Sequence, residues 1–480
     1  MDGFANLIGG EWIAGTDWTE DVNPSDLSDR IGRFPRGTAA DVNAAVAAAR
    51  QAQPLWAGAT PAERHAVLSR IAARILADAE RLGRELSREQ GKTLAEGRAE
   101  AIRAGQIFDF HAGEALRQEG LAIPSLRAGV EIEVTRVPVG TVGVITPWNY
   151  PLAIPAWKIA PALAWGNAVI FKPADLVPHS AVLLARIIAE SGLPAGVFNL
   201  VMGRGSVVGE AMLTHPHIDA ISITGSQATG LRVAQAAAAR FPLKKVQLEL
   251  GGKNPLVVLD DADLAVAVPA AINGAFHGTG QRCTASSRLI VTEGIHDRFV
   301  AALTEAMQGL TVGHALDPAT VVGPVVDAGQ LQQNLDYIAI GRAEGARLIV
   351  GGERLERPTE GFYMAPALFT EATNAMRICR EEIFGPIAAV IRVRDYEEAL
   401  AVANDTEFGL SAGICTTSLK HAHHFRRHAA AGLVMVNLPT AGVDFHVPFG
   451  GRKGSSHGPR EQGRAAVEFY TTTRTAYLAP

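Results

Sequence analysis

The middle of the chain alternates short apolar runs with longer amphipathic stretches. Five apolar runs have the length of buried strands: 142–145, 169–171, 197–201, 221–224 and 246–250. The stretches between them have helical spacing: near 152–164, 179–191, 206–213 and 227–239. This alternation predicts an α/β fold with a parallel, doubly wound sheet. In such a sheet the chemistry is expected beyond the carboxyl ends of the strands.

The alternation restarts after Gly251-Gly252, and so predicts a second α/β domain with a border near Leu250. Its expected strands are 256–259, 288–291, 388–393, 413–415 and 434–436. Its expected helices lie near 263–276, 295–308, 395–404 and 418–430. Ahead of the first domain's strands, 60–82 and 93–116 are expected to be helices. Thr60-Pro61-Ala62-Glu63 has the form of a capping box with proline at the first helical position.

Two segments fit neither domain, because their polar and apolar residues alternate with a period of two. They are 130–137 and, more loosely, 469–477. Both are expected to be exposed strands, which need partners to avoid open edges. We therefore expect an arm that joins subunits.

Composition narrows the class of protein. The 480 residues are enough for at least two cores, and 48% apolar with 19% charged residues is typical of a soluble globular protein. A net charge of −5 argues against a nucleic-acid binder. The three cysteines have no CxxC spacing and cannot all pair, which indicates a reduced, cytoplasmic protein. Neither a signal peptide nor a membrane span is evident, so no membrane partner is expected.

Three side chains supply the parts needed to carry an acyl group through a thioester. Cys283 offers a thiol nucleophile, Glu249 a carboxylate base and Asn149 an amide donor. Each also has a simpler interpretation: a buried cysteine, a solvated strand-end carboxylate and a turn asparagine. Their order along an α/β chain favours the chemical interpretation. Cys379 and Cys415 are expected to be structural.

Two glycine-rich turns could present backbone N–H groups to a pyrophosphate at a helix N-terminus. They are 203–209 and 224–230, and each is weak evidence alone because such turns are frequent. Lys172 and Asp175 follow the second expected strand, where a ribose could be held or where an ordinary surface pair could lie. Three histidines share one helical face (His421, His424 and His428). A metal site is conceivable there, but a solvated basic face is favoured, and no metal is expected.

Seven motifs occur in the order typical of one family. They are Pro147-Trp148-Asn149-Tyr150-Pro151, Phe171-Lys172-Pro173-Ala174-Asp175, Ile223-Thr224-Gly225-Ser226, Leu248-Glu249-Leu250-Gly251-Gly252-Lys253, Gly280-Gln281-Arg282-Cys283, Glu381-Glu382-Ile383-Phe384-Gly385-Pro386 and Pro448-Phe449-Gly450-Gly451. The chain thereby resembles the aldehyde dehydrogenase superfamily over essentially its whole length. The resemblance implies a Rossmann-type NAD(P)-binding domain (1–119 and 140–250), a catalytic domain (251–445) and a β-arm for oligomerisation (120–139 and 460–480). A homo-oligomer follows, with dimer and tetramer both open.

The resemblance also implies a role for each matching residue. Cys283 corresponds to the nucleophile, Asn149 with the Cys283 main-chain N–H to the oxyanion hole, Glu249 to the deacylating base and Lys158 to a proton carrier near it. Cofactor contacts are implied at Thr146, Pro147, Trp148, Lys172, Ala174, Asp175, Arg204, Gly205, Thr224, Gly225, Ser226, Leu250, Gly251, Glu382 and Phe384. Asp175 stands where the family usually has glutamate, so the choice between NAD⁺ and NADP⁺ stays open. A second glutamate found in some relatives corresponds by position to Thr472, so no such role is assigned.

Within the superfamily the chain most resembles bacterial α-ketoglutaric semialdehyde (2,5-dioxopentanoate) dehydrogenases. The resemblance lies in 172–178, 199–205, 280–288 and 439–451. It implies a small anionic aldehyde from sugar-acid catabolism as substrate. Arg282 could form a bidentate pair with its carboxylate, or could instead pack against a neighbouring subunit. The other expected tunnel residues are Tyr150, Trp157, Ser286, His446 and Phe449.

Other functions remain open at this point. Oxidation of succinic or glutaric semialdehyde, or of aldehydes in general, would use the same residues. Acyl transfer to coenzyme A or phosphate is disfavoured by Glu249, and a non-catalytic binding or structural protein by the intact catalytic set. A cysteine hydrolase would need a partner histidine, and no recognisable motif supplies one.

Overall fold

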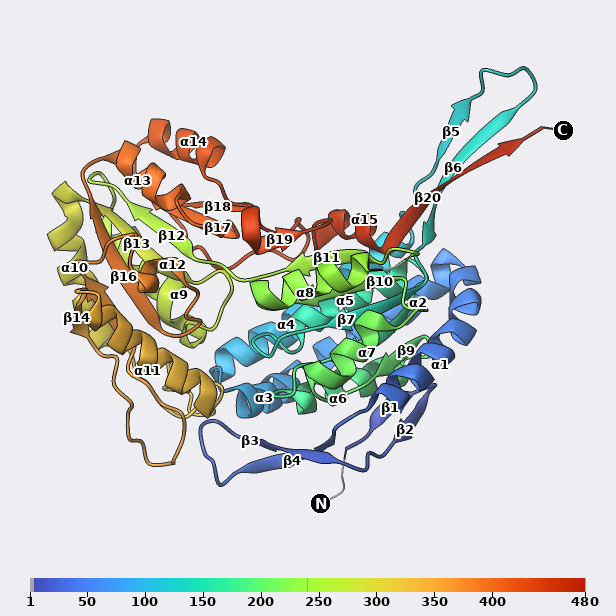
Figure 1. Cartoon of the computed structure of the whole chain (residues 1–480), viewed down its shortest axis with the longest axis horizontal. Helices are drawn as coiled ribbons and strands as arrows, with labels where there is room; N and C mark the ends of the chain where they lie inside the picture. Colours follow the sequence, from blue (N-terminus) through green and yellow to red (C-terminus); the bar gives the residue numbers. More distant parts are fainter. Residues whose placement is uncertain (1–3, 240, 480) are drawn as a thin grey trace.

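The computed structural model describes residues 4–239 and 241–479, and two bodies of sheet and helix lie side by side in it (Figure 1). The first contains an eight-stranded sheet. Its strands run in the order β19 (Ser456–His457), β11 (Lys245–Glu249), β10 (Ala220–Thr224), β7 (Thr141–Ile145), β8 (Ala168–Lys172), β9 (Phe198–Leu200), β1 (Asn6–Ile8) and β2 (Glu11–Ile13). The strands from β11 to β9 are parallel, and those at the two edges are antiparallel.

Helices cover both faces of this sheet because its strands are apolar on both sides. Val142, Val169 and Phe171 face one hydrophobic cluster, whereas Ala168 and Ile170 face another. The helices of this body are α1 (Ala39–Gly58), α2 (Pro61–Ala77), α3 (Ala79–Gln90), α4 (Leu94–Ala115), α5 (Ala153–Ala164), α6 (Pro178–Ala189), α7 (Glu210–Thr214) and α8 (Gln227–Ala238), with a π-helical turn η1 (Gly205–Gly209) before α7. The predicted doubly wound sheet is therefore confirmed.

Helix boundaries follow local chemistry. The predicted capping box at Thr60 is confirmed: its side chain accepts from Glu63 N, the Glu63 side chain accepts from Thr60 N, and Pro61 opens α2. The expected helix over 60–82 ends at Ala77, and α3 begins after Asp78. The pattern of apolar residues continues across this break, which is why the sequence suggested one helix.

The second body has a seven-stranded sheet in the order β14 (Arg347–Val350), β15 (Ala367–Thr370), β16 (Ile387–Val393), β13 (Ser286–Thr292), β12 (Asn254–Val258), β17 (Ser411–Cys415) and β18 (Leu433–Val436). Only β14 is antiparallel to its neighbour. Its helices are α9 (Leu264–Phe276), α10 (Glu293–Gln308), α11 (Ala328–Ala343), α12 (Arg377–Arg380), α13 (Tyr396–Asn404) and α14 (Leu419–His428). Again two separate hydrophobic clusters lie on the two faces of the sheet.

A three-stranded arm projects from the first body, and the C-terminus lies on it (Figure 1). Its strands are β20 (Thr471–Leu478), β6 (Glu131–Pro138) and β5 (Leu121–Pro124), all antiparallel. The C-terminal segment contributes to the arm only from Thr471 onward. Before that point β19 pairs with β11, and the short helix α15 (Val467–Tyr470) packs on the first body's core. A separate hairpin, β3 (Trp18–Val22) and β4 (Arg30–Pro35), lies near the N-terminus.

The connection between the two bodies is short. β11 ends at Glu249 in the first sheet, and β12 begins at Asn254 in the second. The carboxyl end of the first sheet therefore meets the second body where Glu249 lies. Across residues 4–239 and 241–479, no helix is both long and apolar enough to cross a membrane.

Candidate active site

Cys283 lies in a tight loop between α9 and β13. Gly278, Thr279 and Gly280 all have left-handed backbone angles, with φ of 61°, 57° and 64°. A Cβ atom at Gly280 would collide with the main-chain oxygen of Gly385, so only glycine fits there. The carbonyl of Cys283 accepts a hydrogen bond from Asn254 Nδ2 at 2.8 Å. These contacts fix the loop at the junction of the two bodies.

Asn149 approaches the same loop from the first body. Its Nδ2 donates to the carbonyl of Gln281 at 3.0 Å, and the side chain is buried. A side-chain amide has two N–H groups, so one remains to donate elsewhere. The predicted donor, on the first body, is thus bonded to the loop that carries the predicted nucleophile Cys283 on the second body.

Glu249 is buried at the end of β11, and its Oε2 accepts a hydrogen bond from Ser456 Oγ at 2.6 Å. Burial raises the pKa of Glu249 well above its ordinary value, and the nearby Glu461 raises it further. The Ser456 hydrogen bond and the charges of Lys158 and Arg460 act in the opposite direction. A carboxyl group with a raised pKa can hold and release a proton near neutral pH, as a general base must.

Lys158 forms a fully buried ion pair with Glu461. Its Nζ also donates to Ser222 Oγ at 2.9 Å, and Ser222 donates to Gln247 at 2.8 Å. Glu461 was not predicted from the sequence, and Thr472 was expected to occupy the position of the second glutamate found in some relatives. That expectation is wrong, because Thr472 is exposed on β20 in the arm.

A sequence signal for Glu461 existed. Only two acidic residues, Glu461 and Glu468, follow Phe449 in the chain. Of these, Glu468 pairs with Arg136 near the arm, whereas Glu461 reaches the interior. The sequence therefore leaves only these two carboxylates as candidates for a C-terminal acidic residue near Glu249.

The thiol of Cys283 is strongly influenced by its surroundings. Burial raises its pKa to about 12, and the carboxylates of Glu382 and Glu249 add to the effect. At neutral pH the group is therefore a thiol in this structure, and positive charge brought next to it would favour the reactive thiolate.

Several expected cofactor residues gather at the carboxyl end of the first sheet. Ser226 is the N-cap of α8, and Gly225 N donates to the carbonyl of Glu249 at 3.0 Å. The buried Thr224 Oγ1 finds no hydrogen-bond partner among the described residues. A helix N-terminus with a glycine before it suits a phosphate group, so these residues fit a dinucleotide.

Glu382 and Phe384 come from the second body and face the same region. Glu382 Oε1 accepts from Gly252 N at 2.8 Å, and burial raises the pKa of Glu382 to about 7. A Cβ atom at Gly251 would collide with the Glu382 carboxylate, which explains the need for glycine. Phe384 packs edge-on against Trp148, with ring centroids 5.3 Å apart. The two bodies thus contact each other where the expected cofactor residues lie.

The remaining expected cofactor residues are placed as follows. Lys172 ends β8 and pairs with Asp175 at 3.2 Å, and Ala174 lies between them in the same loop. Thr146 and Pro147 follow β7, and Leu250 follows β11, so all three lie at carboxyl ends of parallel strands. Arg204 and Gly205 are exposed at the start of η1.

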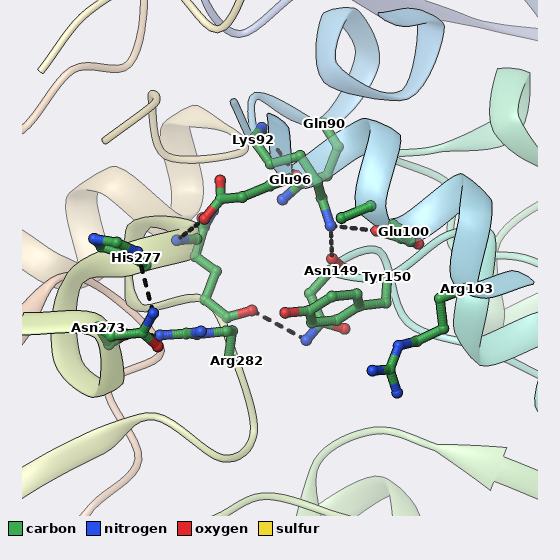
Figure 2. A pocket seen from close by; sticks show the side chains of 13 residues that line it. Gln90, Lys92, Glu96, Glu100, Arg103, Asn149, Tyr150, Asn273, His277 and Arg282 are labelled. Atoms are coloured by element: carbon green, nitrogen blue, oxygen red, sulfur yellow. Dashed lines mark hydrogen bonds and ion pairs between the residues drawn. The ribbon is translucent and has the colours of Figure 1, made fainter. Parts of the chain in front are cut away.

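A cavity of about 240 Å³ opens beside Asn149 (Figure 2). It is lined by Gln90, Lys92, Glu96, Ala99, Glu100, Arg103, Asn149, Tyr150, Asn273, His277, Gly278, Gln281 and Arg282. Tyr150 and Arg282 were expected near a substrate, whereas Lys92, Glu96, Glu100 and Arg103 were not recognised from the sequence. These four belong to α4 or the turn before it, a segment without a motif.

The other expected tunnel residues do not line this cavity. Ser286 is buried on β13 and bonds to Thr440 Oγ1 at 2.6 Å. His446 is exposed. Trp157 and Phe449 stack on each other with centroids 5.6 Å apart. Trp157 and Phe449 therefore contact each other, and the side chain of Ser286 is directed to Thr440.

The histidine face of α14 is held by aromatic contacts. Tyr396 stacks on His421 with centroids 4.4 Å apart, and its hydroxyl lies 2.7 Å from His424 Nδ1. His428 stacks on His424 at 3.9 Å. Within the described part of the chain, no group of three or more His, Cys, Asp or Glu side chains is arranged to hold a metal ion.

The chain is similar to known proteins of one family. A family model described as the aldehyde dehydrogenase family matches residues 12–476. The chain is 46% identical to an alpha-ketoglutaric semialdehyde dehydrogenase from Bacillus subtilis over 99% of this chain and 98% of that relative. It is similar to the crystal structure of an NAD-dependent aldehyde dehydrogenase from Sinorhizobium meliloti, with a TM-score of 0.96, 34% identity and coverage of 100% and 95% of the two chains. It is also similar to the structure of an NADP-dependent enzyme from E. coli, with a TM-score of 0.95, 34% identity and coverage of 99% and 98%.

Proposed function

Since the chain belongs to the aldehyde dehydrogenase family and is an NAD(P)⁺-dependent aldehyde oxidoreductase, we propose that its substrate is 2-oxoglutaric semialdehyde (2,5-dioxopentanoate). The product is 2-oxoglutarate. The observation that carries this proposal is the position of Arg282, which adjoins Cys283 in the chain and lines the cavity beside Asn149. The name of the Bacillus subtilis relative supports the same substrate.

The charges of the cavity favour an anionic substrate. Lys92 is paired with Glu100, and Glu96 accepts from Gly278 N at 2.7 Å. Among the described residues, Arg282 donates to the main-chain carbonyls of Asn273 and Gly274, and Arg103 donates to that of Val443, with no side-chain acceptor for either. No ion pair joins either arginine to a carboxylate of the described residues. A guanidinium with unused N–H groups suits a carboxylate, which it can bind through two parallel hydrogen bonds.

We assign the first chemical step to Cys283 and Asn149. The Cys283 thiol first loses its proton to solvent. The thiolate then attacks the aldehyde carbon, and the C=O bond opens so that the oxygen becomes an anion. The free N–H of Asn149 Nδ2 and the main-chain N–H of Cys283 donate to that anion. NAD(P)⁺, when bound, would be held by the regions around Ser226, Lys172 and Glu382, and it would accept the hydride that leaves the carbon as the anion reforms the carbonyl. Cys283 then carries the acyl group as a thioester.

We assign the second step to Glu249, with Lys158 assisting. Glu249 takes a proton from water, and the resulting hydroxide attacks the thioester carbon. The C–S bond then breaks to release the carboxylic acid, and the Cys283 thiolate takes the proton back from Glu249. The raised pKa of Glu249 supports this role, since a base of ordinary acidity would accept a proton less readily. The buried Lys158–Glu461 pair lies in the same network. The charge of Lys158 favours the ionised form of Glu249, whereas the charge of Glu461 disfavours it.

The same cavity would also accept succinic or glutaric semialdehyde, which carry a distal carboxylate without the keto group. The test is a set of initial rates of cofactor reduction on 2,5-dioxopentanoate, succinic semialdehyde, glutaraldehyde and benzaldehyde, each with NAD⁺ and NADP⁺. We expect the highest kcat/KM for 2,5-dioxopentanoate. Equal or higher values for the uncharged aldehydes would contradict the carboxylate-binding role of the arginines.

A second measurement tests the assignment of Glu249. In the Glu249→Gln variant the burst of reduced cofactor should persist, because acyl transfer to Cys283 does not need the base. The steady-state rate should fall, because the thioester is no longer hydrolysed efficiently. Loss of the burst with normal cofactor binding would move Glu249 to an earlier step.

We further propose a cytoplasmic homo-oligomer joined through the arm. All three cysteines are free, which supports a reducing compartment. The arm exposes Leu121, Ile123, Tyr477 and Leu478, and apolar strands of this kind need a partner surface. Light scattering coupled to gel filtration tests this. A chain that stays monomeric at micromolar concentration would refute the proposal.

A further inference from the structure

The loop that carries Asn149 and Tyr150 is held from the side of α4 by one buried lysine. Lys92 Nζ donates to the main-chain carbonyl of Asn149 at 2.8 Å and forms an ion pair with Glu100. It also lies 4.0 Å from the centre of the Tyr150 ring. An ammonium group has three N–H donors, and here they meet a carboxylate, a carbonyl and an aromatic face. Figure 2 shows these contacts along the cavity wall.

Glu100, on α4, binds the other end of the same segment. Its Oε2 pairs with Lys92, while its Oε1 accepts from the main-chain N–H groups of Leu152 and Ala153 at 2.9 and 3.1 Å. Leu152 is the N-cap of α5 and has no side-chain acceptor of its own. Glu100 therefore caps α5 from another helix. It also fixes the point where the loop enters α5, the helix that carries Lys158.

The pair is almost fully enclosed, with 6% of the Lys92 side chain and 1% of the Glu100 side chain exposed. A buried ion pair is weak evidence for stability, because removing two charges from water is costly. The pair instead fixes the geometry of the loop. Lys92 binds one end of the segment from Asn149 to Ala153, Glu100 binds the other end, and both residues belong to α4 or the turn before it.

We propose that Lys92 and Glu100 are positioning residues for the aldehyde oxidation, acting through Asn149 and Tyr150. Lys92 fixes the carbonyl of Asn149 and thereby the direction in which its side-chain amide donates. The ammonium group of Lys92 also contacts the Tyr150 ring and holds it at the cavity wall. The inference rests on the oxyanion role proposed for Asn149, and it goes beyond that role by naming what orients the donor.

The central test is the rate of hydride transfer, followed as the burst of reduced cofactor after rapid mixing. Lys92→Met keeps the length of the side chain but removes all three donors, and it should slow the burst by about 10²-fold, as expected for a displaced oxyanion donor. Cofactor affinity, measured by fluorescence titration, should stay unchanged. Lys92→Arg should recover part of the rate because it keeps the charge and donors.

A matched control separates positioning from general loss of structure. Arg64 is a buried cation on α2, a helix packed on α4, and it donates to the carbonyls of Ala57 and Ala59 at 3.3 and 2.7 Å. Arg64→Met loses a comparable buried group away from the loop. Its burst should stay within about twofold of the parent enzyme.

A double-mutant cycle distinguishes action through Asn149 from independent action. In an Asn149→Ala background, Lys92→Met should slow the burst by less than about threefold, because the donor that Lys92 orients is gone. The full 10²-fold effect in both backgrounds would overturn the inference while leaving the role of Asn149 intact. An unchanged burst in Asn149→Ala alone would refute the oxyanion role, and the inference with it.

Glu100→Gln gives a second route if Lys92→Met does not fold. The amide oxygen of glutamine still accepts from Leu152 and Ala153, but the charge opposite Lys92 is lost. We expect a burst about 10-fold slower, again much less affected in the Asn149→Ala background. A burst equal to that of the parent enzyme would overturn the positioning role of the pair.

Discussion

Removal of one hydroxyl beside Glu249 should change the pH at which the enzyme works. Ser456 Oγ donates to Glu249 Oε2 at 2.6 Å and accepts from Gly451 N at 2.6 Å. The first of these bonds stabilises the ionised carboxylate, and it lowers a pKa that burial and Glu461 raise. Ser456→Ala removes it. The pKa of Glu249 should therefore rise further, so that less of the group is ionised at a given pH.

The size of the effect follows from the bond. A hydrogen bond to an ionised group contributes about 1.5–3 kcal/mol, and each 1.36 kcal/mol corresponds to a factor of ten. Below the pKa of Glu249 the fraction of carboxylate should thus fall by about 10- to 150-fold, and hydrolysis of the thioester with it. Well above that pKa, both enzymes hold Glu249 ionised and their rates should converge. The acid limb of the pH–rate profile should move toward alkaline pH.

The assay combines the burst of reduced cofactor with the steady-state rate, each measured across pH. Only the steady-state rate should change in Ser456→Ala, because the hydroxyl contacts the base and not the thiol. Ser456→Thr keeps a hydroxyl and is the matched control. An acid limb that does not move, or a burst slowed as much as the steady state, would refute the assignment of Glu249 to thioester hydrolysis.

Three further predictions follow from the same geometry. Cys283→Ala should abolish oxidation and leave cofactor binding, measured by fluorescence titration, unchanged; retained turnover would remove Cys283 as the nucleophile. Because burial and two carboxylates raise the pKa of Cys283 to about 12, alkylation of the free enzyme by iodoacetamide should accelerate about tenfold per pH unit above neutrality, and an early plateau would contradict this. Arg103→Met and Arg282→Met should each raise the KM for 2,5-dioxopentanoate about tenfold or more, while that for benzaldehyde changes little. Arg98→Met, on the same helix as Arg103 but exposed, is the control for both, and equal effects on the two aldehydes would count against the carboxylate contact.

The elements that the sequence predicted well are those buried on both faces. β7 (Thr141–Ile145) and β10 (Ala220–Thr224) lie within a residue of the apolar runs at 142–145 and 221–224. A strand between two layers of helices must be apolar throughout, so its pattern is plain. The strands β1, β2, β14 and β15 were not predicted, since each has only three or four residues and so shows no clear pattern.

For the candidate site, sequence motifs identified the catalytic residues but not the residues that position them. Cys283, Glu249 and Asn149 follow strands or turns that the pattern already located. By contrast, Lys92 and Glu100 lie 57 and 52 residues from the main-chain groups that they bind, those of Asn149 and Leu152. The residues next to Lys92 and Glu100 in the sequence give no indication of such long-range contacts. Ser286 was expected to line the substrate tunnel, but β13 begins at this residue and its side chain bonds to Thr440.

The division of the catalytic groups between two sheets has a consequence for how the protein is made. During translation Glu249 is synthesised before Cys283. Ser456 and Glu461, which complete the surroundings of Glu249, are synthesised after both. The nascent chain therefore contains a reactive thiol only after the first sheet's parallel strands have been synthesised, and it gains a fully tuned base only in the last few dozen residues. Translation products that end before Cys283 should therefore not oxidise aldehydes.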